Sequence, residues 1–371
     1  MYINFWYPIA TSESVTAEAP ARAQVLGHMF VAYRDSDGVA HVLADTCIHR
    51  GGALGEGKVV GDNIQCPYHG WQFDAAGKCQ HIPVLCDETP PARAKVDAYP
   101  TEERYGIVFA FLGDLPEDER PPLFEIPEAN DEGWRVLPPS VYEVEAYFER
   151  VIENGLDPAH NEFVHPKQGT PGMIQDFKKN PIEMNPVGDY GTGFMVPFTL
   201  ANPDASALNK DMLKDEDAIH AGSGHYGPNL LITWLHFNKT NKFHQYNFEA
   251  PVDETRTRNF LVNTRCFILD PSHDQGIVDT NMEVAEEDIV VLEKLYPRYT
   301  PESSSDELLI HTDVPVVKYR EFLDDWNSRG WRIDRQQLID NRGKKATAIP
   351  SPGRRDEKNW VHDSAALLSG K

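Results

Sequence analysis

Cys47-Ile48-His49 and, after sixteen intervening residues, Cys66-Pro67-Tyr68-His69 decide the fold of the first part of this chain. Each segment offers one thiolate and one imidazole. Thiolates on one iron and neutral nitrogen ligands on the other suit a two-iron, two-sulfide cluster, in which the imidazoles raise the reduction potential. The pattern therefore predicts a redox centre.

A structural zinc ion is the alternative, because two cysteines and two histidines also fill a tetrahedral zinc shell. Such zinc sites usually pair Cys with Cys and His with His, whereas each segment here mixes the two types. Glycines follow both segments, at Gly51-Gly52 and at Gly70, and let backbone amides approach cluster sulfurs. Residues 71–82 read as strand, turn and strand, so we expect the ligand loops at the tips of β-hairpins.

The two segments, the second of which continues as Gly70-Trp71, resemble the Rieske motif. The resemblance implies that Cys47, His49, Cys66 and His69 bind a [2Fe-2S] Rieske cluster. Alternating apolar segments at 25–33 and 106–112 predict strands on either side of the loops. We therefore expect an all-β Rieske [2Fe-2S] domain over residues 1–115.

A second candidate site lies in the middle of the chain, at residues 153–165. His160 and His165 are five residues apart, and a regular helix would separate them by about 140°. Both imidazoles can therefore reach one ion only if the backbone deviates from a helix. Pro158 disfavours helical geometry at Asp157 and suits the start of a new turn with Asp157 as its N-cap. Capping is also the alternative role of Asp157, and ordinary hydrogen bonding is the alternative for the histidines.

The set Asn154, Asp157, His160 and His165 resembles the mononuclear-iron motif of the Rieske non-haem iron oxygenases. The resemblance implies that His160, His165 and a later carboxylate bind Fe(II), and that Asn154 orients these ligands. It also implies that Asp157 connects His160 to the cluster ligand His69 of a neighbouring subunit, which predicts a homotrimer.

The carboxylate ligand is sought in the helical pattern of residues 282–295. At about 100° per residue, Asp288 lies at the centre of an apolar stripe. The stripe consists of Val284, Ala285, Val291, Leu292 and Leu295. A carboxylate on a core face costs several kcal/mol unless it is paired, protonated or bound to a metal. Asp288 is the predicted ligand, Glu287 is the second choice, and a buried salt bridge or cap is the alternative role of Asp288.

Two imidazoles and one carboxylate leave positions of an iron open to dioxygen and substrate. The run Glu287-Asp288-x-x-x-Leu292-Glu293 is similar to that of the Rieske oxygenases that lack a small second subunit. Strand patterns at 230–237, 243–250 and 257–269 precede this helix and indicate an α+β domain with an antiparallel sheet. For the catalytic mononuclear iron domain, residues 116–371, the resemblance implies a START-like helix-grip fold.

Residues 166–228 are rich in Gly, Pro, Asn and Asp and have weak periodicity. Long irregular segments in compact domains are usually lids or disordered. Since this segment lies between the histidines and the strands, one hypothesis is that it covers the substrate. Beyond residue 341 the sequence is polar, and we expect a mobile tail.

Composition narrows the class of protein. The 371 residues suit two domains, and a net charge of −23 argues against nucleic acid as a partner. The sequence has no leader pattern and no apolar run of the ~20 residues that a membrane span needs, and its five cysteines imply no disulfide framework. These features predict a cytoplasmic protein without a membrane partner.

Arg50, Lys58 and Lys78 form a candidate basic patch for an acidic ferredoxin, or are scattered surface charges.

The sequence contains no flavin or nicotinamide motif, so electrons would come from a separate ferredoxin and/or flavin reductase. The resemblance implies a terminal oxygenase that uses O2 to hydroxylate or demethylate an aromatic or polycyclic substrate, in the homotrimeric monooxygenase and demethylase branch. A ring cis-dihydroxylating dioxygenase is one alternative. A non-catalytic electron carrier or redox sensor is another, although it leaves Asp288 unexplained.

Overall fold

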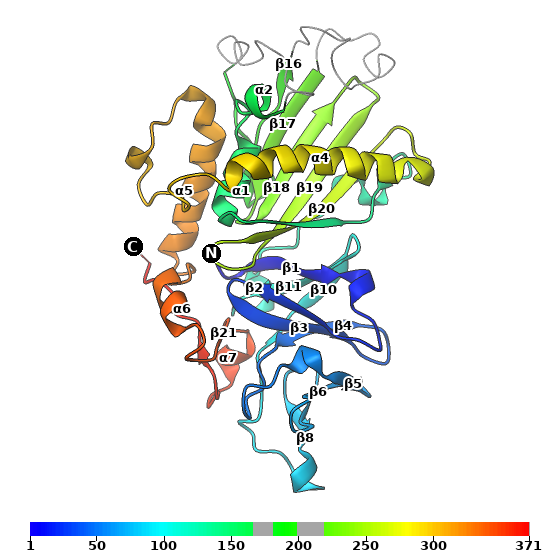
Figure 1. Ribbon diagram of the computed structural model, residues 1–371, viewed down its shortest axis with the longest axis vertical. Coiled ribbons are helices and arrows are strands. Elements are labelled where there is room, and N and C mark those ends of the chain that lie inside the picture. Colours follow the sequence, from blue (N-terminus) through cyan, green and yellow to red (C-terminus); the bar gives the residue numbers. More distant parts are fainter. Residues whose placement is uncertain (166–180, 199–218, 371) are drawn as a thin grey trace. The chain divides into compact units, whose positions relative to one another are not determined.

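The computed structural model describes residues 1–165, 181–198 and 219–370, which form two compact units (Figure 1). The first unit comprises residues 1–123, 250–254 and 326–371, and the second comprises residues 124–249 and 255–325. The predicted ranges were 1–115 and 116–371. The structure differs from them because the last 46 residues of the chain, 326–371, belong to the first unit.

The first unit is built from small β-sheets, as predicted for its N-terminal part. One has the order β1-β11-β10, from Phe5–Thr11, Ile107–Leu112 and Thr101–Arg104. A second has the order β2-β3-β4-β9, from Ala21–Val25, His28–Arg34, Ala40–Ala44 and Ala98–Tyr99. A third has the order β5-β6-β7-β8, from Lys58–Val60, Asn63–Gln65, Gln72–Phe73 and Cys79–His81. The third sheet carries the second ligand segment between β6 and β7.

The C-terminal segment is ordered against the first unit, which contradicts the expected mobile tail. It contains α6 (Arg335–Asn341), β21 (Thr347–Ala348), α7 (Gly353–Asp356) and β22 (Asp363–Ser364). The Arg354 guanidinium donates to both carboxylate oxygens of buried Asp97 at 2.7 Å. Ser351 Oγ donates to the same carboxylate at 2.7 Å. The sequence did not predict that this segment is ordered, because long-range ion pairs rather than an apolar stripe anchor it.

Within the described residues, the second unit has a nine-stranded sheet, which confirms the predicted antiparallel sheet. Its order is β12-β20-β19-β18-β17-β15-β14, with β13 paired to β20 and β16 paired to β17. The central strands are β17 (Ile219–Tyr226), β18 (Leu230–His236), β19 (Lys242–Pro251) and β20 (Thr257–Arg265). The outer strands are β12 (Arg135–Val136), β13 (Ser140–Val144), β14 (Asn185–Pro186), β15 (Gly191–Gly193) and β16 (Val196–Phe198).

The irregular segment predicted over residues 166–228 is wrong where the chain forms β14, β15 and β16, and it is wrong for its last part, which forms β17. Gly222 and Gly224 suit this strand because their missing side chains let neighbouring backbones approach. A Cβ at Gly222 would lie 1.9 Å from the carbonyl oxygen of Phe194. The hypothesis of a substrate-covering segment concerns mainly residues 166–180 and 199–218, which lie outside the described residues.

Helices lie on one face of the sheet. They include α1 (Phe148–Leu156), α2 (Asn161–Val164), α4 (Asp274–Leu292) and α5 (Val314–Ser328), and α4 runs across the strands in Figure 1. Gly155 of α1 packs so closely on β18 that a Cβ there would lie 2.1 Å from Leu231 Cδ2. Because side chains alternate along a strand, the face that carries Leu231 also carries the odd-numbered residues of β18.

The opposite face of the sheet is apolar and aromatic. Tyr226 packs on Phe124 at a ring separation of 5.0 Å, and Trp234 lies against Gly193 and Gly224. Tyr226, Trp234 and Phe248 therefore belong to the core on the side away from the helices. They are therefore part of the sheet core rather than of a substrate pocket beside the helices.

Candidate active site

The two predicted cluster segments form matching loops. The amide of Gly51 donates to the carbonyl oxygen of Cys47, and the amide of Gly70 donates to that of Cys66. Both glycines have positive φ, 71° and 73°, a backbone conformation that favours glycine. The sequence pattern Cys-x-His or Cys-x-x-His followed by glycine therefore describes two equivalent turns.

The four predicted ligands converge, with the thiols inside and the imidazoles outside. Cys47 and Cys66 are buried and close enough for their thiols to interact, while His49 and His69 are exposed. The two imidazole rings lie 4.4 Å apart between centroids. His49 stacks on Trp71 at 4.6 Å, which holds the ring in place.

The surroundings of these side chains fit an iron–sulfur cluster. Burial, with a contribution from Cys66, raises the pKa of the Cys47 thiol to about 12, so two neighbouring thiols in this dry setting gain most by binding a metal as thiolates. A Cβ at Gly52 would lie 2.8 Å from Cys66 Sγ. Gly52 thus leaves room beside the sulfur that any other residue would fill.

The predicted mononuclear site also converges. His160 Nε2 and His165 Nε2 lie 3.4 and 3.3 Å from Asp288 Oδ1, and the two nitrogens lie 3.3 Å apart. The three atoms therefore form a nearly equilateral triangle. Metal bonds to imidazole and carboxylate are about 2.0–2.2 Å long, and an ion at that distance from all three atoms caps such a triangle. The donor set fits the two-histidine, one-carboxylate arrangement of non-haem Fe(II).

Both histidines are held by their other ring nitrogen. His160 Nδ1 lies 2.5 Å from the backbone carbonyl oxygen of Asp157, and His165 Nδ1 lies 2.9 Å from Glu287 Oε2. Each Nδ1–H donates, so each Nε2 keeps its lone pair for a metal. The break in the helix predicted at Asp157 and Pro158 makes this possible, since α1 ends at Leu156 and α2 begins at Asn161.

Asp288 stays ionised although it is largely buried. Burial alone would raise its pKa, but the nearby imidazoles of His160 and His165 and the side chain of Asn154 outweigh this and hold the pKa of Asp288 well below its usual range. In the same way, burial would lower the pKa of His165, but Asp288 and Glu287 raise it. Asn154 thus contacts the predicted carboxylate ligand, as the resemblance implied for a residue that orients the site.

Three details differ from the sequence interpretation. The side chain of Asp157 accepts from the amide of Ala159 at 2.7 Å, the capping role, and His160 is held by the backbone of Asp157. Glu287, the second choice for the ligand, is half-buried and accepts from His165 Nδ1 instead. Val291 and Leu295 are each 40% exposed, so the predicted stripe is too wide at its C-terminal end. The side chains of α4 that face the sheet include Ile277, Asn281, Asp288 and Leu292.

Two domain families match the chain. The Rieske [2Fe-2S] domain matches residues 5–100, and the vanillate O-demethylase oxygenase C-terminal domain matches residues 144–329, half of the chain. The chain is a Rieske non-haem iron oxygenase. This confirms the resemblance seen in the sequence. The first matched family binds a [2Fe-2S] cluster and the second binds a mononuclear iron, which are the two cofactors of the oxygenase.

The oxygenase is similar over most of its length to characterised proteins. Methylxanthine N1-demethylase NdmA of Pseudomonas putida is 28% identical over 331 residues, covering 86% of this chain and 88% of the relative. The oxygenase component of 3-ketosteroid-9-alpha-monooxygenase from Mycobacterium tuberculosis is 27% identical over 252 residues, covering 67% and 60%. The structure of Pseudomonas putida CBB5 NdmA with caffeine matches with a TM-score of 0.73 at 25% identity, covering 91% of this chain and 94% of NdmA.

The arrangement divides the work between the two metal sites. When bound, the cluster supplies single electrons and the mononuclear iron supplies the place where dioxygen and substrate react. Glu287 and the Asp157 carbonyl keep both imidazoles oriented, and Asn154 holds the Asp288 carboxylate. These contacts come from α1, α2 and α4, so the site is preorganised by three helices on one face of the sheet.

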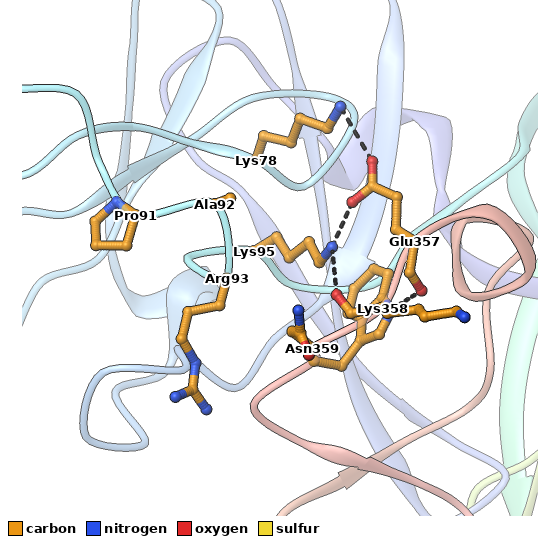
Figure 2. A pocket seen from close by; sticks show the side chains of 9 residues that line it. Lys78, Pro91, Ala92, Arg93, Lys95, Glu357, Lys358 and Asn359 are labelled. Atoms are coloured by element: carbon orange, nitrogen blue, oxygen red, sulfur yellow. Dashed lines mark hydrogen bonds and ion pairs between the residues drawn. The ribbon is translucent and has the colours of Figure 1, made fainter.

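A pocket of about 820 Å³ lies in the first unit, away from the described ligand side chains (Figure 2). Glu357 accepts there from Lys95 Nζ at 2.5 Å and lies 3.1 Å from Lys78 Nζ. In the candidate basic patch, Lys78 is therefore paired, and the Arg50 guanidinium lies over the Tyr68 ring at 5.7 Å. Docking of an electron donor on this patch stays a prediction.

Proposed function

We propose that this oxygenase removes a methyl group from a nitrogen or oxygen atom of an aromatic substrate. In this reaction the methyl carbon, O2, two electrons and two protons give a hydroxymethyl group and water. The hydroxymethyl product then loses formaldehyde and leaves the nitrogen or oxygen protonated. Support comes from the matched demethylase domain family and from the similarity to a methylxanthine N-demethylase over 86% of the chain.

The observation that carries the proposal is the triangle of His160, His165 and Asp288 donor atoms, 3.3–3.4 Å apart. A non-catalytic electron carrier has no use for such a triangle. In our proposal these three residues bind Fe(II), and Cys47, His49, Cys66 and His69 bind the cluster.

We further propose that the oxygenase works as a cytoplasmic homotrimer that receives electrons from a ferredoxin and/or a flavin reductase. Asp157 would then link the iron site of one subunit to His69 of the next. The side chain of Asp157 is half-buried, so part of it remains free to meet a partner. Light scattering of the purified oxygenase tests the assembly, and a monomer would contradict this role of Asp157.

The decisive variant is Asp288→Ala, compared with Asp279→Ala. Both residues lie on α4, but Asp279 is exposed and pairs only with Gln275 among the contacts of its carboxylate that the structure describes. We expect Asp288→Ala to lose the mononuclear iron and formaldehyde release while the visible absorption of the cluster persists. Asp279→Ala should behave like wild type.

The assay combines iron and sulfide analysis with oxygen uptake and formaldehyde detection, using a surrogate reductase and a panel of N-methyl and O-methyl aromatics. Formaldehyde release by Asp288→Ala at the wild-type rate would contradict the ligand assignment. Hydroxylated products that keep the methyl group throughout the panel would contradict demethylation.

A further inference from the structure

The sheet face that α4 covers carries amide side chains whose hydrogen bonds are only partly used inside the protein. Gln245 Nε2 donates to Asn263 Oδ1 at 3.2 Å and to Asn281 Oδ1 of α4 at 3.4 Å. On the same face, Asn247 Nδ2 donates to Asn259 Oδ1 at 3.0 Å. Asn259 and Asn263 have no exposed surface.

One end of several of these amides has no partner among the described residues. The Nδ2 groups of Asn259, Asn263 and Asn281 are buried without a hydrogen-bond acceptor. Turning an amide over exchanges its oxygen and nitrogen but still leaves one end free, since the other end faces its neighbour. Each buried unpaired group costs about 1–3 kcal/mol. Three such groups on one face therefore indicate that a bound molecule completes their hydrogen bonds.

The side chains of Gln245, Asn247, Asn259, Asn263 and Asn281 form a polar row, which we call the amide row. Glu249 belongs to the same row. It lies two residues after Asn247 on β19, has no exposed surface, and neither carboxyl oxygen has a partner in the described part of the chain. Burial raises the pKa of Glu249 well above its usual value, which favours the protonated carboxyl, a group that can donate as well as accept.

The row lies next to the predicted iron ligands. Tyr142 of β13 lies opposite Asn259 of β20 in the sheet register, and it packs against the same apolar cluster as Ile289, the residue after Asp288 on α4. Asn281 precedes Asp288 by seven residues on α4, about 10 Å along the helix. A ring system of two fused rings can therefore reach from the amides to His160, His165 and Asp288, which we call the triad.

A charged group also lies beside the amides. Arg265, two residues beyond Asn263, donates to Asp274 at 2.7 Å, and Arg135 donates to the same carboxylate. Apolar walls border the row, since Phe243 packs with Leu235 and Ile277 of α4. The free amide ends are thus neutral donors with apolar surface beside them.

We propose that the substrate is a planar, fused-ring molecule with a ring amide, whose carbonyl oxygen accepts from Asn263 and Asn281 while its methyl group faces the triad. This inference rests on the proposed function and specifies its substrate class. A hydrocarbon of the same shape would leave the amides unpaired and bind weakly, because sites built to hydrogen-bond a ligand reject analogues that lack the polar group.

The test compares two probes of the same size on the holoenzyme without oxygen. They are 1-methyl-2-quinolone, which has a ring amide, and 1-methylnaphthalene, which has none. We expect the quinolone to bind at least about tenfold more tightly in equilibrium titrations, as one lost buried hydrogen bond implies. Equal affinities would overturn the inference and would show that water satisfies the amides equally well with either probe.

Two variants assign the preference to residues. Asn263→Leu and Asn281→Leu should each reduce the preference for the quinolone to near unity, while the surface variant Asn185→Leu keeps it. Asn281 is half-buried on a helix, so its variant tests the idea even if Asn263→Leu does not fold. An unchanged preference in a folded Asn281→Leu protein would overturn the role of the row.

The outcomes separate this inference from the proposed function. Tight binding of the quinolone without formaldehyde release from any substrate would contradict demethylation but support the amide row. Demethylation of methoxynaphthalenes as efficient as that of N-methyl ring amides would support the function and overturn the substrate class.

Discussion

At the scale of single residues, the site depends on the groups that hold the predicted ligands. Glu287 is the clearest case, because its carboxylate accepts from His165 Nδ1 at 2.9 Å. A carboxylate in this position orients the imidazole and makes its other nitrogen a better ligand. Glu287 was missed as a positioning residue because helical periodicity places it outside the predicted apolar stripe.

The variant Glu287→Gln should lower the affinity for Fe(II) by about 10- to 100-fold, the usual effect of removing such a partner. The cluster spectrum should not change, since the cluster segments lie elsewhere in the chain. The neighbouring exposed variant Glu286→Gln is the control. Anaerobic iron titration measures both, and equal affinities would show that the Glu287 carboxylate does not act on His165.

Glu249 predicts a pH dependence of stability. Its pKa in the folded protein is raised well above the ordinary value of 4.5 by burial, so the folded state keeps a proton that the unfolded state loses. Stability from this group is therefore complete below pH 4.5 and is lost as the pH rises toward the folded pKa.

Glu249→Gln cannot ionise, so wild type should lose stability relative to this variant by up to about 1.4 kcal/mol per pH unit above pH 4.5. Apparent unfolding midpoints in urea at pH 5 and pH 8 measure the difference. Glu286→Gln, at the surface, should follow wild type. Parallel curves for wild type and Glu249→Gln would mean that Glu249 is already ionised in the folded protein.

At the scale of elements, the position of α1 sets the geometry of the second site. Gly155 lets α1 lie directly on Leu231 of β18, and the same helix carries Asn154 and ends just before Asp157. A side chain at Gly155 would push the helix away from the sheet. The distances around His160 and Asp288 are therefore a consequence of one close contact between a helix and a strand.

Gly155→Ala should destabilise the protein by about 1–3 kcal/mol, as overpacking of a core does, and should weaken Fe(II) binding. Leu231→Val shortens the opposing side chain, so the double variant should lose less than the sum of the two single variants. Thermal unfolding and iron titration of all four proteins complete the cycle. Additive losses would show that Gly155 and Leu231 do not restrain each other.

At the scale of the whole chain, the first unit is completed by residues that are distant in sequence. Asp97 is almost fully buried and is neutralised by Arg354, 257 residues away. Removing one partner of a buried pair leaves an uncompensated charge. The ordered C-terminal segment is thus part of the structure that supports the Rieske domain.

Arg354→Leu should cost about 3–5 kcal/mol of stability and reduce retention of the cluster. Its neighbour Arg355 is exposed and pairs with Asp114, so Arg355→Leu should cost no more than about 1 kcal/mol. Thermal unfolding followed at the visible absorption of the cluster measures both variants. Similar small losses would show that Asp97 is satisfied by Ser351 alone.

None of the helices in the described residues is long and apolar enough to cross a membrane, in agreement with the apolar runs of the sequence.

The sequence also predicted most of the helices and strands that local patterns can specify. Strands at 230–237, 243–250 and 257–269 are confirmed within a few residues as β18, β19 and β20, and the helix around Asp288 is confirmed as α4. These elements have strong periodicity, and period and propensity act between near neighbours.

The sequence by itself determined the two ligand motifs, because Cys47, His49, Cys66 and His69 lie in two short turns and His160 and His165 flank one break in a helix. Only the tertiary structure decided which carboxyl groups meet them. Asp288 and Glu287 are adjacent and chemically alike. The crossing of α4 over the sheet places Asp288 beside the Nε2 atoms of both histidines and Glu287 beside Nδ1 of His165.

The amide row also depended on tertiary structure. Gln245, Asn247 and Glu249 alternate with apolar residues along β19, a pattern that usually marks a face exposed to water. Here helices cover that face and bury its polar groups. Alternation along a strand shows that two faces differ, but only packing decides which of them meets solvent, and burial is what turns ordinary polar side chains into a binding surface.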